Sequence, residues 1–429
     1  MPAGAPSGQR ARGCQRAVAA GSDGGAVPAR SDGARMPARS ARGPAPTPEP
    51  PGRLEHVNEV EIGRAKRARR VYAFDDIAIV PTRRTRDPED VSISWSIDAF
   101  QFEIPFIAAP MDSVVSPTTA IRIGQLGGLG VLDLEGLWTR YDNPEPLLAE
   151  IRTLPAADAI SRMQAIYAEP IKPELVTQRL AEIRAGGVTV AGALSPHRTQ
   201  ELYKTVVEAG VDLFFIRGTT VSAEHVSKTQ EPLNLKKFIY ELDVPVIVGG
   251  AASYTPALHL MRTGAAGVLV GFGGGAASTT RASLGIHAPM ATAVADVAGA
   301  RRDYMDESGG RYVHVIADGG LGTSGDIVKA VAMGDDAVML GSTLARATDV
   351  PGAGYHWGAE AHHPELPRGN RVAVASIAPL EQILFGPSAA ADGTSNLAGA
   401  LRRSMATTGY SDLKEFQRVD VVVAPYAPR

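Results

Sequence analysis

Eight short apolar segments recur along the chain, separated by longer stretches of mixed polar and apolar character. They lie at 104–109, 129–132, 188–192, 211–216, 244–248, 266–270, 313–317 and 336–340. Each segment is rich in Val, Ile and Leu and nearly continuous in apolarity, which is typical of strands that are covered on both faces. The intervening stretches have helical spacing, so the pattern predicts repeated strand–helix units around a parallel sheet.

Glycines often stand just before the next predicted strand, where a helix commonly ends in a left-handed residue. They are Gly127-Gly128, Gly186-Gly187, Gly210, Gly264 and Gly334. Eight such units favour a closed TIM (β/α)₈ barrel over an open doubly wound sheet. After the eighth strand we expect a loop with Pro and His at 351–370, an apolar segment at 383–385 and a late helix around 396–406.

Residues 1–57 differ sharply in composition from the remainder. They are rich in Ala, Gly, Pro, Arg and Ser, and they contain no Phe, Trp or Tyr. Because such a segment cannot bury enough apolar surface to offset its conformational entropy, we predict a disordered low-complexity tail at 1–57 and one barrel domain at 58–429. An Arg-rich organellar targeting peptide is the alternative, although Pro and Gly would interrupt its amphipathic helix.

Composition and charge restrict the classes of partner. The chain is 44% hydrophobic and 21% charged with a formal net charge of −3, which favours a small-molecule partner over nucleic acid or an anionic membrane. No apolar run of about 18 residues predicts a membrane span. Cys14 is the only cysteine, which excludes an intramolecular disulfide and a zinc site built on several thiolates, and favours a cytoplasmic location.

Two further features have a plain and a functional interpretation. His356, His362 and His363 could ligate a metal, but their spacing matches no familiar pattern, so we predict no metal site. The basic run from Arg64 to Arg70 could contact nucleic acid, but a short run of this kind is more typical of a solvated face.

The loops that follow the last three predicted strands carry the candidate chemistry. In TIM barrels the loops after the strands form the active face, and phosphate commonly binds in those after the seventh and eighth strands. The seventh strand leads into Asp318-Gly319-Gly320, where a carboxylate can hold ribose hydroxyls and glycines let backbone N–H groups approach a phosphate. The eighth leads into Gly341-Ser342, and the sixth into a loop from Gly271 to Arg281 that contains three consecutive glycines. A tight turn or a flexible connector is the alternative for each loop, but their shared placement favours a ligand site.

Several segments in the same order resemble the IMP dehydrogenase/GMP reductase family from about residue 60 to the C-terminus. They are Ala73 to Pro81 (AFDDIAIVP), Pro110 to Val114 (PMDSV), Leu126 to Val131 (LGGLGV), Ala317 to Gly320 (ADGG), Met339 to Ser342 (MLGS) and Leu397 to Tyr410 (LAGALRRSMATTGY). Only Asp133 to Gly187 separates the second strand from the third. This leaves no room for the CBS pair of most such dehydrogenases and resembles the family's compact paralogues.

The resemblance implies a homotetrameric enzyme that oxidises IMP to XMP with NAD in guanine nucleotide metabolism, with a monovalent cation and a covalent bond between a loop cysteine and C2 of the purine. It implies that Asp318 holds the ribose, that Gly320, Gly341 and Ser342 hold the phosphate, and that Met111 lies along the base. Gly275 and Gly319 join this substrate set. Arg217, Gly271 and Gly273 are the implied cofactor positions, and Ser278, Thr280 and Arg368 the implied catalytic ones.

The same resemblance shows where this sequence departs from the family. Ser278 stands at the position of the cysteine, and Ala276 at that of a phosphate-binding serine. Arg217, Ala251 and Leu269 replace an aspartate, an asparagine and an arginine. A serine hydroxyl attacks poorly unless a base activates it. The arginine of the family's water-activating pair has no clear counterpart, and the candidates are Arg368 and Arg371.

Three hypotheses for function follow. The first is an IMP dehydrogenase-type oxidoreductase in which Ser278 or water replaces the cysteine. The second, a variant of the first, is a GMP reductase-like enzyme that uses NADPH. The third is a non-redox protein that binds a purine nucleotide and regulates or assembles with a true dehydrogenase.

Overall fold

The computed structural model describes residues 59–81, 84–228, 232–388 and 390–424. The predicted tail at 1–57 lies outside the described residues.

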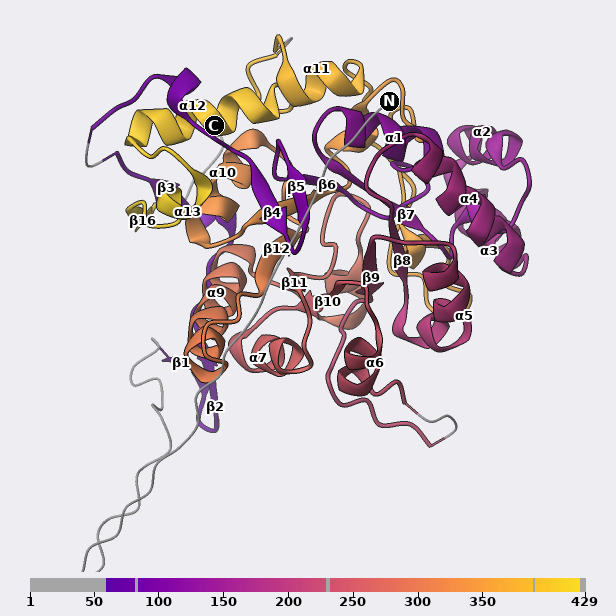
Figure 1. The fold of residues 1–429 in the computed structure, drawn as a ribbon, viewed down its shortest axis with the longest axis horizontal. Helices are drawn as coiled ribbons and strands as arrows, with labels where there is room; N and C mark the ends of the chain where they lie inside the picture. The colour runs from indigo at the N-terminus through magenta and orange to yellow at the C-terminus, as the bar shows by residue number, and fades with distance from the viewer. Residues whose placement is uncertain (1–58, 82–83, 229–231, 389, 425–429) are drawn as a thin grey trace, which may run out of the picture. The chain divides into compact units, whose positions relative to one another are not determined.

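Eight parallel strands close into a barrel, which confirms the predicted fold (Figure 1). In chain order they are β6 (Phe106–Ala108), β7 (Leu129–Asp133), β8 (Ala191–Leu194), β9 (Leu213–Arg217), β10 (Val246–Ala251), β11 (Gly267–Val270), β12 (His314–Asp318) and β13 (Ala337–Leu340). The last strand pairs with the first through Val338 and Phe106, and this pairing closes the cylinder. The third strand begins later than predicted, because the N–H of Val190 donates to the side chain of Asp212 instead of joining the ladder.

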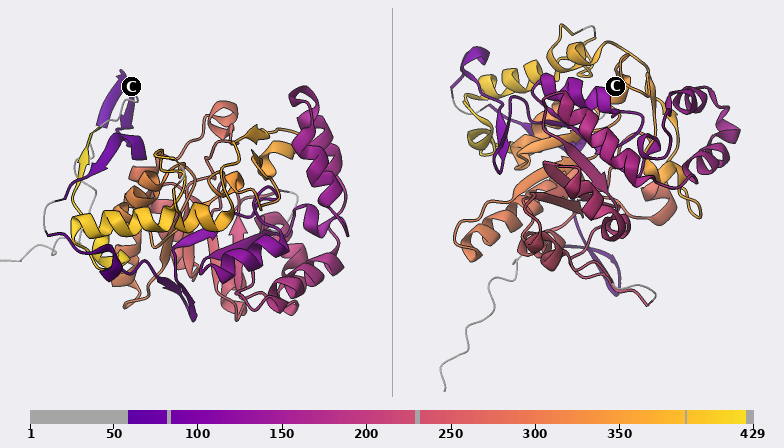
Figure 2. Two further views of the ribbon diagram at one scale, coloured as in Figure 1. Left: turned by 90° about the horizontal axis from the view of Figure 1, so that it is seen from above. Right: turned by 45° about the vertical axis from the view of Figure 1, so that its right-hand side comes forward.

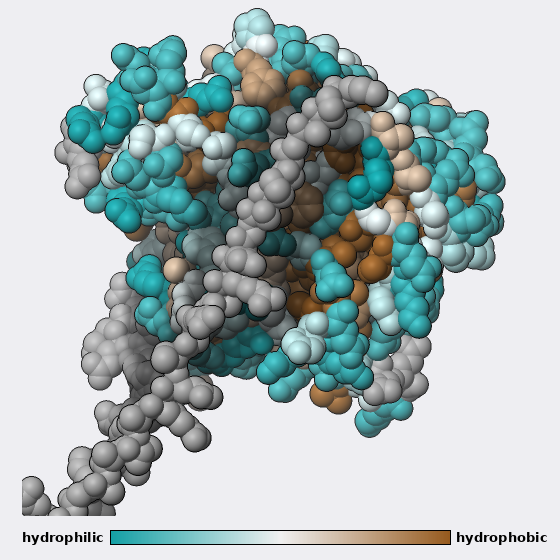
Figure 3. Space-filling model, in the orientation of Figure 1, coloured by the Kyte–Doolittle hydropathy of each residue, from teal (hydrophilic) through white to brown (hydrophobic). Residues whose placement is uncertain are grey.

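Helices surround the strands in the alternating order that the sequence predicts. They are α1 (Pro117–Gln125), α2 (Glu145–Thr153), α3 (Ala156–Tyr167), α4 (Pro173–Ala185), α5 (Pro196–Glu208), α6 (Leu235–Glu241), α7 (Tyr254–Arg262), α8 (Thr280–Leu284), α9 (Met290–Glu307), α10 (Ser324–Met333), α11 (Leu380–Phe385), α12 (Leu397–Thr408) and α13 (Leu413–Phe416). Only α2, α3, α4 and one 3₁₀ turn at Leu137–Thr139 lie between β7 and β8, so no CBS insertion is present there. Their visible outer surface is mainly hydrophilic (Figure 3), as expected of helices that cover a barrel.

Local sequence explains where individual helices begin and end. Helix α10 begins with a capping box, in which the hydroxyl of Thr323 accepts from the N–H of Asp326 and the Asp326 carboxylate accepts from the N–H of Thr323. It ends at Gly334, whose φ is 126° and where a Cβ would lie 2.6 Å from that of Ala298. Only glycine fits this turn, which confirms the predicted helix stop.

Short elements close the barrel's flanks. The strand pairs are β1 (Glu59–Gly63) with β2 (Lys66–Arg69), β3 (Ile77–Ile79) with β16 (Val421–Val423), β4 (Trp95–Ile97) with β5 (Phe100–Phe102), and β14 (Tyr355–His356) with β15 (Val372–Ala373). Single 3₁₀ turns are η1 (Phe74–Asp76), η2 (Pro88–Asp90), η3 (Leu137–Thr139), η4 (Leu344–Arg346) and η5 (Ala359–His362). The predicted late helix is α12, which packs along α10 and α11 on one side of the barrel (Figure 2).

The predicted basic run from Arg64 to Arg70 contains the turn and the second strand of the β1–β2 hairpin, and two of its arginines are paired with carboxylates. Arg67 lies near Glu59 and Glu61, and Arg69 makes two hydrogen bonds of 2.6 and 2.8 Å to Asp296 on α9. These pairs favour a solvated face over a nucleic-acid site. Within the described ranges, no helix is long and apolar enough to cross a membrane.

Candidate functional site

The loops after β11 and β12 touch through their backbones at the carboxyl end of the barrel. The N–H of Gly273 donates to the carbonyl of Asp318 at 3.0 Å. Gly319 has a φ of 116°, and a Cβ placed on it would lie 2.5 Å from the backbone N of Gly274. This contact requires glycine at position 319, so the predicted glycine-rich loops do form one surface.

The loop after β13 completes this surface. A Cβ placed on Gly275 would lie 3.6 Å from Oγ of Ser342, and one placed on Gly341 would lie 3.3 Å from Sδ of Met111. Among the described residues, the backbone N–H groups of Gly320 and Ser342 donate to no protein acceptor. Free backbone N–H groups in glycine-rich loops are suited to bind an anion. The predicted substrate residues therefore lie together at one end of the barrel.

Arg217 and Asp318 form an ion pair in the mouth of the barrel. Nε of Arg217 donates to Oδ2 of Asp318 at 2.9 Å, and the two side chains are only 11% and 5% exposed. Burial lowers the pKa of the Arg217 guanidinium, but the charges of Asp318 and Glu360 outweigh this effect and raise it. Arg217 is therefore a fixed positive charge beside the residue predicted to hold the ribose.

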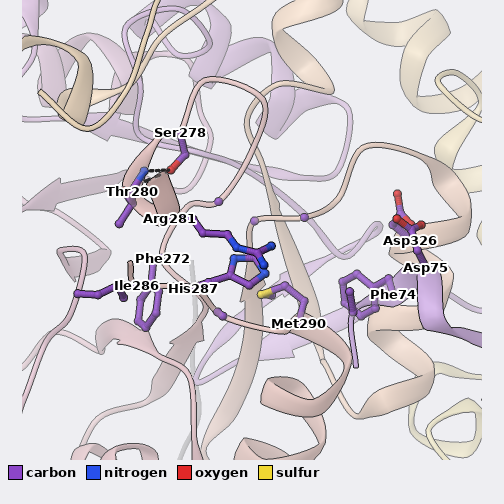
Figure 4. A pocket seen from close by; sticks show the side chains of 15 residues that line it. Phe74, Asp75, Phe272, Ser278, Thr280, Arg281, Ile286, His287, Met290 and Asp326 are labelled. Carbon is purple, nitrogen blue, oxygen red and sulfur yellow. Dashed lines mark hydrogen bonds between the residues drawn. The ribbon is translucent and has the colours of Figure 1, made fainter. Parts of the chain in front are cut away.

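Ser278 lies in the loop after β11 without a base to activate it. Its hydroxyl donates to that of Thr280 at 3.3 Å and accepts from the Thr280 N–H at 3.4 Å (Figure 4). No described histidine, lysine or carboxylate forms a hydrogen bond with it. The predicted nucleophile and Thr280 are neighbours, but this arrangement does not raise the reactivity of the hydroxyl.

The two candidate arginines of the late loop lie in different places. Arg368 contacts the Ser278 loop through its backbone, because the carbonyl of Arg368 accepts from the N–H of Thr279 at 2.7 Å. Its guanidinium donates to Oγ1 of Thr219, after β9, at 3.0 Å. Arg371 instead donates to the carbonyls of Arg152 and Leu154 at the end of α2. Arg368 therefore borders the candidate site, whereas Arg371 is held elsewhere.

A cavity of about 320 Å³ adjoins Ser278 and the Gly319–Gly320 turn (Figure 4). Phe272, Ile286, His287 and Met290 line it, together with Phe74 from the segment before the barrel. Burial and the charge of Arg281 lower the pKa of His287. Phe272 lies in the predicted loop from Gly271 to Arg281, and Phe74 lies in a segment that resembles the family. The sequence did not indicate Ile286, His287 or Met290.

Next to Met111, the side chains of Asp112, Tyr167 and Trp357 form a buried series of hydrogen bonds that the sequence did not indicate. Oδ2 of Asp112 accepts from the N–H of Leu137 at 2.9 Å and from the hydroxyl of Tyr167 at 2.7 Å, and Tyr167 accepts from Nε1 of Trp357 at 2.9 Å. Burial raises the pKa of Asp112 to about 6, although both hydrogen bonds lower it. Asp112 belongs to the PMDSV segment, but nothing in the sequence indicates that residues 167 and 357 join it.

The three histidines of the late loop do not converge. Nδ1 of His356 lies 3.0 Å from Oγ of Ser113, and burial lowers the His356 pKa to about 4. His362 stacks on the ring of Tyr167, and burial lowers its pKa to about 3. Nδ1 of His363 accepts from the N–H of Leu366. No described group of three histidine, cysteine or acidic side chains could hold a metal ion.

The fold and these loops define a TIM barrel whose loops after β11, β12 and β13 form one surface at the carboxyl ends of these strands. Residues 71–362 match the family model described as IMP dehydrogenase / GMP reductase domain. The chain belongs to this family.

Individual relatives agree with this assignment. An uncharacterised oxidoreductase of Mycolicibacterium smegmatis is 52% identical over 372 residues, which span 85% of this chain and 99% of that protein. An IMP dehydrogenase/GMP reductase-like protein of Corynebacterium glutamicum has a solved structure with a TM-score of 0.82 and 48% identity, covering 85% of this chain and 98% of that one. Inosine-5'-monophosphate dehydrogenase of Methanocaldococcus jannaschii is 27% identical over 82% of this chain and 92% of its own length.

Proposed function

We propose that this protein binds a purine nucleoside monophosphate, with IMP as the first candidate, at the carboxyl end of its barrel. The observation that carries this proposal is the meeting of the glycine-rich loops after β11 and β12 with the Gly341–Ser342 loop after β13. The free N–H groups of Gly320 and Ser342 suit a phosphate. Oδ1 of Asp318 receives no hydrogen bond from the described residues and suits a ribose hydroxyl. Met111, beside Gly341, offers a flexible apolar contact for the base.

The residues that the family resemblance assigns to NAD give the dinucleotide little support in this arrangement. A Cβ on Gly273 would lie 2.5 Å from Nη2 of Arg217, so the guanidinium fills the space above this glycine. A Cβ on Gly271 would meet the carbonyl of Asp318, so close packing of protein backbone accounts for that glycine. The oxidised nicotinamide ring is a cation, and a fixed guanidinium beside it is unfavourable.

Oxidation of IMP to XMP with NAD is the second candidate function. The family match and the oxidoreductase names of the relatives favour it. Because no base activates Ser278, water is then the stronger candidate for attack at C2. Reductive deamination of GMP with NADPH is a variant of this candidate. The homotetramer and the monovalent cation implied by the resemblance stay predictions.

Calorimetric titration tests nucleotide binding. IMP or GMP should bind the wild-type protein, and Asp318→Ala should weaken that binding because the ribose loses its acceptor. If neither IMP nor GMP gives binding heat with the wild-type protein, the proposed function is refuted.

A Ser278→Cys variant tests the second candidate. The wild type and the variant are incubated with IMP and NAD, and NADH absorbance and XMP are measured. Ser283→Cys is the matched control, because it places a thiol at an exposed position of α8 in the same segment. Turnover by Ser278→Cys alone would show that only the nucleophile was lost, whereas turnover by the wild type would establish dehydrogenase activity without a cysteine at position 278. If none of the three proteins produces NADH at high concentration, the dehydrogenase hypothesis is rejected and nucleotide binding stays the proposed function.

A further inference from the structure

Arg217 joins two strands that are not neighbours in the barrel. It stands at the carboxyl end of β9, whereas Asp318 ends β12, and β10 and β11 lie between them. The ion pair between them therefore bridges the carboxyl ends of β9 and β12, beside the glycine-rich loops. Both side chains are nearly enclosed, so the pair is a buried one rather than a surface pair.

The pair uses only one carboxylate oxygen. Nε of Arg217 donates to Oδ2 of Asp318 at 2.9 Å. Oδ1 lies 3.9 Å from the position that a Cβ of Gly273 would take. No described group donates a hydrogen bond to Oδ1. The carboxylate is thus held by one oxygen and keeps the other for a ligand.

The charges around Arg217 explain why it lies in this position. Asp318, Glu360 and Asp133 all raise its pKa through their negative charges. Without Arg217, Asp318 would be buried beside the predicted phosphate site with no guanidinium to balance its charge. A buried carboxylate without a counter-charge is costly, and it also repels an incoming phosphate.

We propose that Arg217 is a positioning residue of the nucleotide site, which holds Oδ2 of Asp318 so that Oδ1 accepts a ribose hydroxyl. The pair stays intact when the nucleotide binds. Arg217 thereby makes the site selective for a ribonucleotide over its 2′-deoxy counterpart. This inference rests on the proposed binding of a purine nucleoside monophosphate.

Titrations with IMP and 2′-deoxy-IMP test the inference on the full chain. Arg217→Gln removes the charge and the fixed Nε donor, so IMP affinity should fall by about 10- to 100-fold, as expected for a hydrogen bond to a charged group. The preference for IMP over 2′-deoxy-IMP should shrink as well, because Asp318 is no longer oriented. Arg217→Lys keeps the positive charge but not the fixed Nε donor. Its preference for IMP over 2′-deoxy-IMP should therefore fall more than its affinity for IMP.

Arg301→Gln is the matched control. Nη1 of Arg301 pairs with Oδ2 of Asp336 at 2.9 Å with 10% and 2% exposure, so this pair resembles the first in length and burial. Asp336 immediately precedes β13 (Ala337–Leu340), at the opposite end of the barrel. Arg301→Gln should lower the unfolding temperature and leave both nucleotide affinities unchanged.

The outcomes separate the inference from the proposed function. If the wild type binds neither IMP nor GMP, the proposed function fails. If the wild type binds IMP and both Arg217 variants keep its affinity and its preference for the ribose, the function stands and the inference is overturned. Tighter binding by Arg217→Gln also overturns it, because Arg217 then competes with the nucleotide for Asp318. If thermal unfolding shows that Arg217→Gln does not fold, the IMP preference of Arg217→Lys decides in the same way.

Discussion

Replacing Gly319 with Ala should damage both the stability and the nucleotide site. A non-glycine residue in a strained backbone region costs about 1–3 kcal/mol, and Gly319 has a φ of 116°. The added Cβ would also lie 2.5 Å from the N of Gly274 and 3.1 Å from the carbonyl carbon of Gly273. Since these neighbours are backbone atoms that cannot rotate away, overpacking adds about 1–3 kcal/mol. The expected total is about 2–6 kcal/mol.

Gly310→Ala separates the two contributions. Gly310 has a similar φ of 106°, but nothing lies within 4 Å of the Cβ that Ala would add. It should therefore lose only the backbone contribution of about 1–3 kcal/mol. Urea unfolding gives the free energies, and titration with IMP gives the affinities. Only Gly319→Ala should also weaken IMP binding, because Gly274 is pushed away from the Gly320 turn. Equal losses of stability in the two variants, with IMP affinity intact in both, would refute this reasoning.

Two further predictions concern buried carboxylates. Asp336 accepts from Arg301 at 2.9 Å, from Tyr312 at 2.8 Å and from the N–H of Val315 at 2.9 Å, so Asp336→Asn should cost about 3–5 kcal/mol by leaving Arg301 buried without a counter-charge. Burial would raise the Asp336 pKa, but His314, whose Nδ1 lies 3.6 Å from Oδ2 of Asp336, and the charges of Arg301 and Lys414 hold it well below its usual range. The wild type should therefore lose this stability as the pH falls below about 4, and urea unfolding of Asp336→Asn should lack that loss. Tyr167→Phe removes a hydrogen bond that lowers the pKa of Asp112, which is already raised to about 6. Asp112 binds its proton more tightly in the folded state, so stability falls as the pH rises from about 4 through 6, and the variant should extend that fall to higher pH. Unfolding at about pH 5 and pH 8 measures it, and an equal loss of about 1–3 kcal/mol at both would count against a role of Tyr167 in the Asp112 titration.

Much of the barrel could be predicted because its signals are local. A strand buried on both faces must be apolar throughout, and the helix before it often ends in glycine, as Gly334 does. The boundary of β8 was less predictable, since the side chain of Asp212 decides where the ladder begins. The grouping of Gly275, Gly319 and Ser342 followed from the rule that barrel loops after the strands share one end.

The sequence by itself determined the strand–helix alternation, the glycine-rich loops, the family resemblance and the replacement of the loop cysteine by Ser278, because each depends on residue type and order. Only the tertiary structure decided how Arg217 is used. Its partner Asp318 lies 101 positions away, and only closure of the barrel brings them within 2.9 Å. The same holds for Asp112, Tyr167 and Trp357, which contact one another through hydrogen bonds that span 55 and 190 positions. Such pairings depend on where the folded backbone places side chains, and residue spacing along the chain does not contain that information.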